Sequence, residues 1–508
     1  MDSFSDSRRS FMQRTAATMT IAATPTLFSA QAYASDMASL LELSATEAVA
    51  RMSRGEMTVE HYASTLLARC EALRALNAFI ALEPSRVLEA ARTADKRRAA
   101  GEKPGPLFGL PIPVKDSVNT ADYPTTAGTP GLRDFRPAED APIVQALRAS
   151  GAIVLGKTNL HELSYGWTSN NRAFGPVHNP YDPTRIPGGS SGGTAAAVAA
   201  RMAPLGVAED TEGSIRVPAA MCGISGFRPS TGRYSTRGCV PISPLFDQAG
   251  PHARNVTDLV LFDSVVADDW RPLHAASLQG LRLGVVRDYW FTGLDPEIER
   301  LTDRALEQLR AAGAQIIETE LPGLQRLIDQ TTQQVQSHDV RVALARFLHD
   351  YGAKPTFEQV VQQASPDIQS IFRASVLPGG ADFVSEQTYI AARDVHLPAL
   401  RRLYADYFAR THVAAIVFPT TMAPAPLIGA DEVVEISGKK VSFFTIAGRN
   451  VGPGSSAGLP GLVLPAGLTS NGLPVGIEFD GPAGSDRALL ALGLGLEHAL
   501  GAIPAPRI

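Results

Sequence analysis

The sequence predicts an α/β fold: a single large domain with a central mixed, mostly parallel sheet that helices cover on both faces. Short apolar runs alternate with helical patterns along most of the chain, as in parallel strands joined by crossover helices. Of the 508 residues, 44% are hydrophobic and 19% are charged, which is enough apolar material for a large core and too little charge for a disordered chain. The predicted strands are residues 110–114, 152–155, 204–208, 281–286, 315–317, 415–418, 461–464 and 475–479.

The first 34 residues have the pattern of an export signal. The segment 7–12, Ser-Arg-Arg-Ser-Phe-Met, resembles the bacterial twin-arginine motif, a stretch rich in Ala and Thr follows over about 15–29, and 32–34, Ala-Tyr-Ala, fits a cleavage site. That stretch is too short and too rich in Thr for a membrane span, which needs ~20 predominantly apolar residues, and no other run reaches that length. We therefore expect no membrane span and a mature protein that begins near Ser35, exported folded to the periplasm or beyond.

Two helices are predicted directly after this segment. Ser44 and Glu47 form a capping box that opens a helix ending near Gly55, and a second helix runs from about Thr58 towards Leu73. We expect residues 35–105 to form an N-terminal helical layer.

Two further helical regions follow the first strands. A helix capped by Asp295, with Pro296 at its first position, ends at Gly313 between two predicted strands, as a crossover helix should. Residues from about 324 to 407 are rich in helix patterns and lack strand patterns. We expect this region to be a helical insertion beside the sheet.

The charge and the cysteines exclude several classes of protein. Lys and Arg total 46 against 51 Asp and Glu, a net charge of -5, and no basic block interleaved with aromatic residues is present. A nucleic-acid partner is therefore not expected. Cys70, Cys222 and Cys239 form no C-x-x-C pair and have no histidine at a zinc-ligand spacing. We expect three small buried side chains, no disulfide framework, no metal and no cofactor.

Two well-known motifs match the sequence but not their required context. Residues 151–158, Gly-Ala-Ile-Val-Leu-Gly-Lys-Thr, fit the P-loop pattern, yet the four variable residues form an apolar strand and not a phosphate-binding loop. Residues 188–192, Gly-Gly-Ser-Ser-Gly, fit the nucleophile elbow of α/β-hydrolases, which needs a strand directly before the serine. The preceding segment 179–187 contains three prolines and cannot be that strand.

Three segments carry residues suited to acyl-transfer chemistry. Lys115 ends the apolar run 110–114, and a lysine buried there can have a pKa low enough to act as a base. The run 188–193, Gly-Gly-Ser-Ser-Gly-Gly, opens a helix predicted over 194–201. Ser214 follows the run 204–208 in a glycine-containing turn, where a nucleophile and backbone N–H donors can share one loop.

These three segments, in this order and spacing, resemble the amidase signature family, whose catalytic unit is Ser-cisSer-Lys. Further matches extend the resemblance from about Ser35 to the C-terminus, so the amidase domain is expected over 35–508. These matches are 156–159 with Glu162, 175–180, 223–232, 458–467 and 472–476.

The resemblance implies a role for each matching residue. Ser214 matches the nucleophile, Ser190 the bridging serine that follows Gly189 in a cis peptide, and Lys115 the base. Ser191 is expected to bond to nearby backbone, and Asp210 and Arg216 to form an ion pair that fixes the loop. The backbone N–H groups that match the oxyanion hole are those of Thr211, Glu212, Gly213 and Ser214.

The sequence departs from the family in the loop before the nucleophile. Members commonly read Gly-Thr-Asp-Thr-Gly-Gly-Ser, whereas residues 208–214 read Ala-Glu-Asp-Thr-Glu-Gly-Ser. If position 212 requires a positive φ, Glu212 costs about 1 kcal/mol or more and changes the shape of the loop. Its side chain either points outward or touches the substrate. Glu209 is expected to make a buried hydrogen bond.

The resemblance implies an exported amidase that hydrolyses a small-molecule amide with water. The segments 227–229, 232–234 and 453–458 resemble the branch acting on indoleacetamide and mandelamide, which favours a small aryl or arylalkyl substrate. The resemblance sets Ser164 and Trp167 beside the nucleophile, and the helical insertion is expected to cover the acyl pocket with Phe372 and Phe383. Alternatives are a carbamate or anilide hydrolase and, less favoured because of export, a transamidating subunit of the amidotransferase A type. The sequence leaves the oligomeric state open, a homodimer included.

Overall fold

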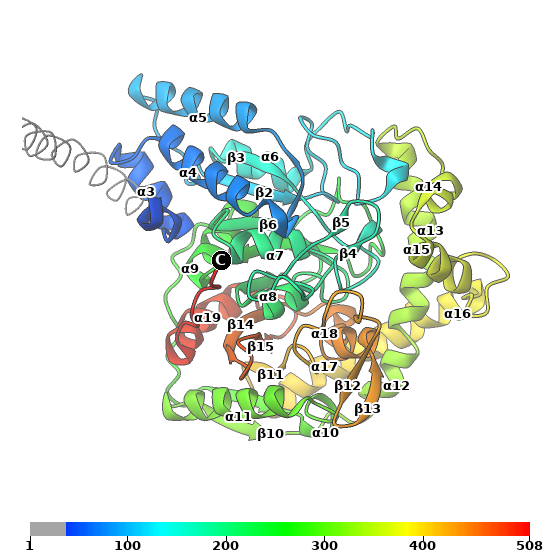
Figure 1. The fold of residues 1–508 in the computed structure, drawn as a ribbon. Helices are drawn as coiled ribbons and strands as arrows, with labels where there is room; N and C mark the ends of the chain where they lie inside the picture. Colours follow the sequence, from blue (N-terminus) through cyan, green and yellow to red (C-terminus); the bar gives the residue numbers. More distant parts are fainter. Residues whose placement is uncertain (1–36) are drawn as a thin grey trace, which may run out of the picture.

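A central sheet of 11 strands organises the computed structural model, which describes residues 37–508 (Figure 1). The export segment predicted at 1–34 lies outside the described residues. The strand order is β1-β3-β2-β6-β8-β7-β14-β15-β11-β9-β10. The strands are β1 Phe79–Leu82, β2 Pro111–Lys115, β3 Ile153–Thr158, β6 Leu205–Asp210, β7 Ser225–Arg228, β8 Gln248–Ala253, β9 Arg282–Val285, β10 Gln315–Glu318, β11 Ala415–Pro419, β14 Gly461–Leu468 and β15 Pro474–Asp480.

The sheet is mixed, as predicted, but the expectation that it is mostly parallel is wrong. Strand β2 runs parallel to β3 and β6, and β9 runs parallel to β10 and β11. The other neighbouring strands are antiparallel. One cause is visible in the sequence, because only residues 469–473 separate β14 from β15, and a parallel crossover needs about a dozen residues or more.

The other cause of the wrong strand directions is that β1, β7 and β8 were not predicted. Strands β7 (Ser-Gly-Phe-Arg) and β8 (Gln-Ala-Gly-Pro-His-Ala) lack an apolar run, since Gly, Pro and polar residues are typical of turns. The glycine in β7 has a packing reason. A Cβ at Gly226 would lie 2.8 Å from the Cβ of Ala219 in the helix that covers this strand.

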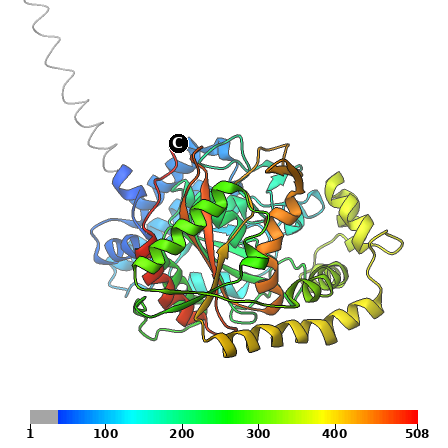
Figure 2. The same ribbon diagram turned by 90° about the horizontal axis from the view of Figure 1, so that it is seen from below.

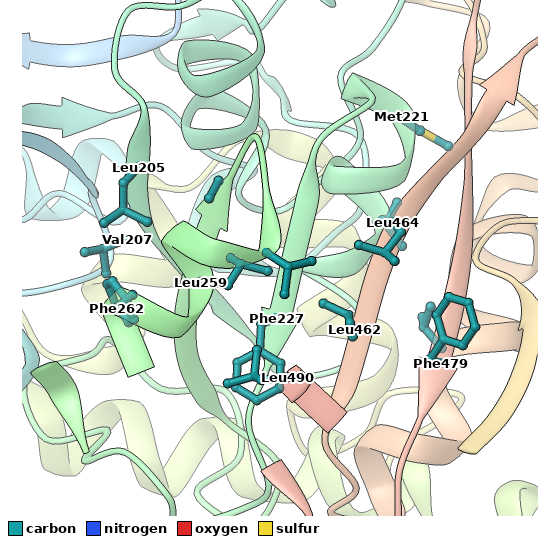
Figure 3. Close-up of a cluster of buried hydrophobic side chains, with 14 of the residues drawn as sticks. Leu205, Val207, Met221, Phe227, Leu259, Phe262, Leu462, Leu464, Phe479 and Leu490 are labelled. Carbon is teal, nitrogen blue, oxygen red and sulfur yellow. The ribbon is translucent and has the colours of Figure 1, made fainter. Parts of the chain in front are cut away.

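Helices cover both faces of the sheet. Helices α7 (Gly192–Ala199) and α8 (Arg216–Cys222) lie on one face, where Gly206 of β6 meets Thr194 of α7. Side chains alternate along a strand, so Leu205 and Val207 point to the opposite face. Figure 3 shows them in the apolar cluster that β7, β14 and β15 form with α9 (Val256–Val266) and α19 (Asp486–Leu500). Helix α11 (Pro296–Ala311) contacts β14, β15 and β11.

The N-terminal part of the described chain is helical. Helices α3 (Ala45–Arg54), α4 (Val59–Ala72) and α5 (Pro84–Ala99) precede β2, and the predicted capping box of Ser44 and Glu47 is confirmed. The remaining short elements are η1 Arg74–Leu76, η2 Pro130–Leu132, α6 Pro142–Ala149, η3 Glu162–Ser164, β4 Asn170–Asn171, β5 Gly175–Pro176 and α10 Arg287–Trp290.

A group of helices between β10 and β11 extends from one side of the molecule, away from α3, α4 and α5 (Figures 1 and 2). A hairpin of β12 (Val433–Ile436) and β13 (Lys439–Ser442) then leads into α18 (Phe443–Ala457). Among residues 37–508, no helix has both the length and the apolar character that crossing a bilayer requires. The helices of the group are α12 Leu324–Asp329, α13 Thr332–Asp350, α14 Phe357–Gln363, α15 Pro366–Ile371, η4 Phe372–Val376, α16 Glu386–Ala391, η5 Ala392–His396 and α17 Leu397–Thr411.

Candidate active site

The three predicted site segments meet at one edge of the sheet. Strands β2 and β6 are parallel neighbours, with Val114 opposite Val207, so their carboxyl ends point the same way. Lys115 is the last residue of β2, and Ser214 lies in the turn between β6 and α8. Ser190 lies just before α7, which packs on both strands. Residues far apart in sequence are thus brought to a common point.

Lys115 is fully buried and has two side-chain partners. Its Nζ lies 2.6 Å from Ser190 Oγ and 3.0 Å from Glu209 Oε1. Burial lowers the pKa of Lys115 below its usual value, and the charge and hydrogen bond of Glu209 only partly offset this effect. A neutral amine at this position is suited to accept a proton.

Ser190 is held tightly by its surroundings. The peptide bond between Gly189 and Ser190 is cis, in agreement with the resemblance. The carbonyl oxygen of Ser190 accepts hydrogen bonds from His161 N at 3.0 Å and from Ser169 Oγ at 3.1 Å. Gly189 is required by space, because a Cβ there would lie 2.7 Å from the carbonyl carbon of Trp167. These contacts fix the Ser190 hydroxyl opposite Lys115.

Ser191 has a structural position, as expected. Its Oγ donates to the carbonyl of Glu209 at 3.0 Å, and its N–H donates to the carbonyl of Ser214 at 3.3 Å. It therefore ties the start of α7 to the segment 209–214.

A buried carboxylate holds the turn that carries Ser214. The two oxygens of Asp210 accept from the N–H of Gly213 at 2.7 Å and from the N–H of Ile215 at 3.0 Å. Burial alone would raise the pKa of Asp210, but the guanidinium groups of Arg216 and Arg228 outweigh it and hold that pKa well below its usual range. The Gly213 N–H is therefore already used, which removes it from the expected oxyanion donors and leaves those of Thr211, Glu212 and Ser214.

The ion pair of Asp210 with Arg216 belongs to a larger buried network. Arg216 Nε lies 3.0 Å from Asp210 Oδ2, and Arg216 Nη1 lies 2.5 Å from Glu478 Oε1 on β15. Arg228 Nη2 donates to the carbonyl of Phe246 at 2.8 Å, and its Nη1 lies 3.3 Å from Asp210 Oδ1. The sequence analysis did not place Arg228 or Glu478 at this turn, because nothing in the sequence aligns β7 and β15 with it.

A cavity of about 480 Å³ opens beside Ser214. The predicted pocket residues Ser164 and Trp167 both line it. Trp167 Nε1 donates to the carbonyl of Glu212 at 2.9 Å, and its ring meets Phe444 edge to face at 4.7 Å between centroids. The wall of the cavity also includes Thr211, Tyr165, Ile371, Phe443, Gln333 and Gln336.

The helical insertion, residues 324–407, lines the cavity, but not with the two phenylalanines that the sequence predicted. Phe372 is fully buried and packs against Tyr165, with ring centroids 5.0 Å apart, and Phe383 is exposed. Neither of these two described residues lines the cavity, so that expectation is wrong. The aromatic wall instead comes from Phe443 and Phe444 at the start of α18, which the apolar pattern of the sequence did not distinguish from core.

The Glu212 side chain lies in the cavity wall. Glu212 does not adopt a positive φ; in this turn Gly213 does, at 108°, so the expected strain at position 212 is absent. Glu212 Oε2 accepts a hydrogen bond from Gln336 Nε2 at 2.7 Å, and a Cβ at Gly452 of α18 would lie 2.6 Å from Glu212 Oε1. Burial, opposed by the Gln336 hydrogen bond, raises the pKa of Glu212 to about 7.

Lys157 and the cysteines have the structural positions that the sequence predicted. Lys157 lies in β3 and is buried, with Nζ 2.8 Å from the carbonyl of Val118 and 3.3 Å from Asp116 Oδ1. It is therefore used by the protein interior and not by a phosphate. Cys70, Cys222 and Cys239 are buried and unpaired.

Comparison with known proteins identifies the family. The Amidase family profile matches residues 62–490. The chain belongs to the Amidase family. As a member it is an enzyme that hydrolyses amide carbon–nitrogen bonds.

This amidase is similar to several characterised members. It is 39% identical to an indoleacetamide hydrolase of Agrobacterium vitis over 458 residues, which cover 90% of this chain and 97% of that one. It is 36% identical to a mandelamide hydrolase of Pseudomonas putida, over 92% of this chain and 93% of the relative. The crystal structure of peptide amidase from Stenotrophomonas maltophilia superposes with a TM-score of 0.77 at 29% identity, covering 92% and 98% of the two chains.

Proposed function

We propose that this amidase cleaves its substrate through an acyl-enzyme formed on Ser214, with Ser190 as the bridging serine and Lys115 as the base. The observation that carries the proposal is the 2.6 Å distance from the buried Lys115 Nζ to Ser190 Oγ, next to a cavity that Ser214 lines. A lysine that burial holds towards its neutral form is a competent base.

The proposed steps follow one proton path. Ser214 Oγ attacks the amide carbonyl carbon while its proton passes to Ser190 and the proton of Ser190 passes to Lys115. The N–H groups of Thr211, Glu212 and Ser214 stabilise the negative oxygen that forms. The same path returns the proton to the departing amine, and a water molecule then repeats the sequence to release the acid.

One link of this path, from Ser214 to Ser190, is not formed in the structure. Among the described residues, no hydrogen bond joins Ser190 Oγ to Ser214 Oγ, whereas the link from Ser190 to Lys115 is formed. Catalytic hydrogen bonds are often long before substrate binds and shorten in the complex. The proposal therefore requires the Ser214 hydroxyl to turn towards Ser190 when substrate fills the cavity.

The proposed substrate is a small aryl or arylalkyl amide. Trp167, Phe443 and Phe444 give the cavity an aromatic wall, which favours a flat acyl group by area burial and edge-to-face contact. The similarity to hydrolases of indoleacetamide and mandelamide supports the same class. Carbamates and anilides use the same chemistry and form the second candidate class.

We also propose that the enzyme acts in the periplasm or outside the cell after export by the twin-arginine route. The support is the sequence of residues 7–34, with its paired arginines and its Ala-Tyr-Ala ending.

The experiment that tests the proposed mechanism is a set of alanine variants assayed on phenylacetamide. Ser214→Ala abolishes turnover, Lys115→Ala comes close to that, and Ser190→Ala loses several orders of magnitude, because each removes one link of a single path. The matched control is Ser191→Ala, which keeps all three groups of the path and removes two hydrogen bonds with the backbone of Glu209; it should lose far less if the variant folds. Turnover of Lys115→Ala within tenfold of the wild type would rule the mechanism out.

A further inference from the structure

Glu209 is the one acidic side chain that reaches Lys115 by an ion pair among the described residues. Its Oε1 lies 3.0 Å from Lys115 Nζ, and the two side chains are 6% and 0% exposed. In the common family sequence this position holds a small polar residue, so the pair is a feature of this chain.

The backbone around Glu209 fixes the direction of its side chain. Glu209 lies in β6, where its Cα partner on β8 is Ala249. Its carbonyl accepts from Ser191 Oγ at 3.0 Å. The carboxylate is thus presented by a paired strand and by the turn that carries Ser190, and not by a mobile loop.

The chemistry of the three groups determines the orientation of the amine. A carboxylate accepts hydrogen bonds and donates none, so neutral Lys115 must direct one N–H at Glu209. The Ser190 hydroxyl lies 2.6 Å from the same nitrogen. With one N–H held by Glu209, the lone pair of the amine is free to face that hydroxyl, which is the orientation needed to accept its proton.

We infer that Glu209 is a positioning residue for the base: it orients neutral Lys115 towards Ser190 and stabilises the ammonium that forms when Lys115 takes the proton. This inference rests on the proposed function of Lys115. It adds to the proposed path from Ser214 through Ser190 to Lys115 a further group that orients the base, as bases in other nucleophilic enzymes are oriented.

Removing the Glu209 charge changes the base in a predictable direction. Burial lowers the pKa of Lys115, and the nearby carboxylate opposes that effect. Without the carboxylate the Lys115 pKa falls further, so the amine is neutral at lower pH but is a weaker base. The other titratable groups that act on Lys115 or Glu209 are Asp210, Asp247, Cys239, His161 and His252.

In any pH experiment, the titration of Asp247 must be distinguished from that of Lys115. Burial, followed by the charge of Glu209, raises the pKa of Asp247 to about 7, and its Oδ1 accepts from Thr211 Oγ1 at 2.6 Å. Loss of Glu209 would lower the pKa of Asp247 as well. The test therefore includes the same change in an Asp247→Asn background.

The experiment measures kcat and KM of the full chain on phenylacetamide from pH 5 to 10 for wild type, Glu209→Gln, Glu209→Asp and Glu209→Thr. The Gln variant keeps the shape of the side chain, and Thr is the kind of small polar residue common in the family, so at least one neutral variant should fold. We expect both to move the acid limb of kcat/KM down by about one to three pH units. We also expect their plateau kcat to fall roughly tenfold or more.

KM should change less than about twofold, because Glu209 does not line the cavity. Glu209→Asp should keep the wild-type limb, and the shift should persist in Asp247→Asn. A limb that stays in place in both neutral variants, or that moves only when Asp247 is present, overturns the inference. Lys115→Ala separates the two proposals: if it is inactive while the limb does not shift, the base assignment stands and the role of Glu209 is wrong.

Discussion

Asp210 and Arg216 form a fully buried ion pair, with Nε 3.0 Å from Oδ2, directly beneath the turn that carries Ser214. The same carboxylate accepts hydrogen bonds from the N–H groups of Gly213 and Ile215, so one side chain fixes both the turn of Ser214 and the start of α8. The geometry around Ser214 therefore depends on charged side chains that do not line the cavity.

Asp210→Asn should destabilise the protein and weaken catalysis together. Breaking a buried pair leaves Arg216 partly uncompensated and costs about 3 to 5 kcal/mol of unfolding free energy. Urea unfolding of the variant measures the loss. The control is Asp303→Asn, which removes a half-exposed partner of Arg287 and should not change the urea midpoint measurably. Equal midpoints for the two variants would contradict the role given to Asp210.

Glu212→Gln should change how stability depends on pH. Burial raises the pKa of Glu212 to about 7, so the folded state favours the protonated acid. The stabilisation from this group is fully present below the unfolded pKa of about 4.3 and is lost as pH rises through about 7. Relative to wild type, Glu212→Gln should therefore gain on the order of 3 kcal/mol of unfolding free energy between pH 4 and pH 8, since each pKa unit corresponds to ~1.4 kcal/mol.

The measurement for Glu212 is urea unfolding of both proteins at those two pH values. Gln keeps the shape of the side chain and a carbonyl that can accept from Gln336, so loss of that hydrogen bond does not mask the effect. An equal change in wild type and variant would mean that folding does not raise the pKa of Glu212.

The aromatic wall should determine substrate preference. We expect kcat/KM for phenylacetamide or mandelamide to exceed that for propionamide by at least about tenfold, because aromatic contact adds to area burial. Phe444→Ala should reduce that ratio several-fold, mainly for the aryl amides, while Phe383→Ala, at an exposed position outside the cavity, should leave it unchanged. Similar rates on all these amides in the wild type would show that the wall does not select the acyl group.

Export should require the two adjacent arginines. Changing Arg8 and Arg9 to lysine should leave the precursor in the cytoplasm, as measured by cell fractionation and immunoblotting. A variant with only Ser3→Ala is a matched control from the same segment. Unchanged periplasmic yield of the double-lysine variant would contradict the export proposal.

The parts of the fold that sequence predicted share a physical signature. Strands such as β2, β3 and β11 are short apolar runs, since both faces of the sheet are covered, and β14 and β15 were found for the same reason. Strands β7 and β8 escaped because glycine, proline and polar residues there meet close helices and buried charges instead of supplying an apolar face. The wrong prediction of a mostly parallel sheet followed from missing these strands.

In the candidate site, too, some features could be predicted from the sequence and others could not. The meeting of the segments of Lys115, Ser190 and Ser214 could be predicted because these segments are local motifs that resemble a family. Glu209 makes the buried hydrogen bond that the sequence predicted, but its partner Lys115 was not predicted, and neither was the ion pair of Arg216 with Glu478. Each of these contacts joins elements that lie far apart in the sequence. Phe444 was missed for a related reason: in sequence a cavity wall has the same apolar pattern as a core.

The most direct test of the central claim is the position of a covalent label. The full chain is treated with a fluorophosphonate, and the modified peptide is mapped by mass spectrometry, with Lys115→Ala as a comparison that should label far more slowly. We expect a single modified residue, Ser214, and loss of activity in proportion to labelling. Modification of Ser190 or Ser191 with Ser214 untouched would contradict it.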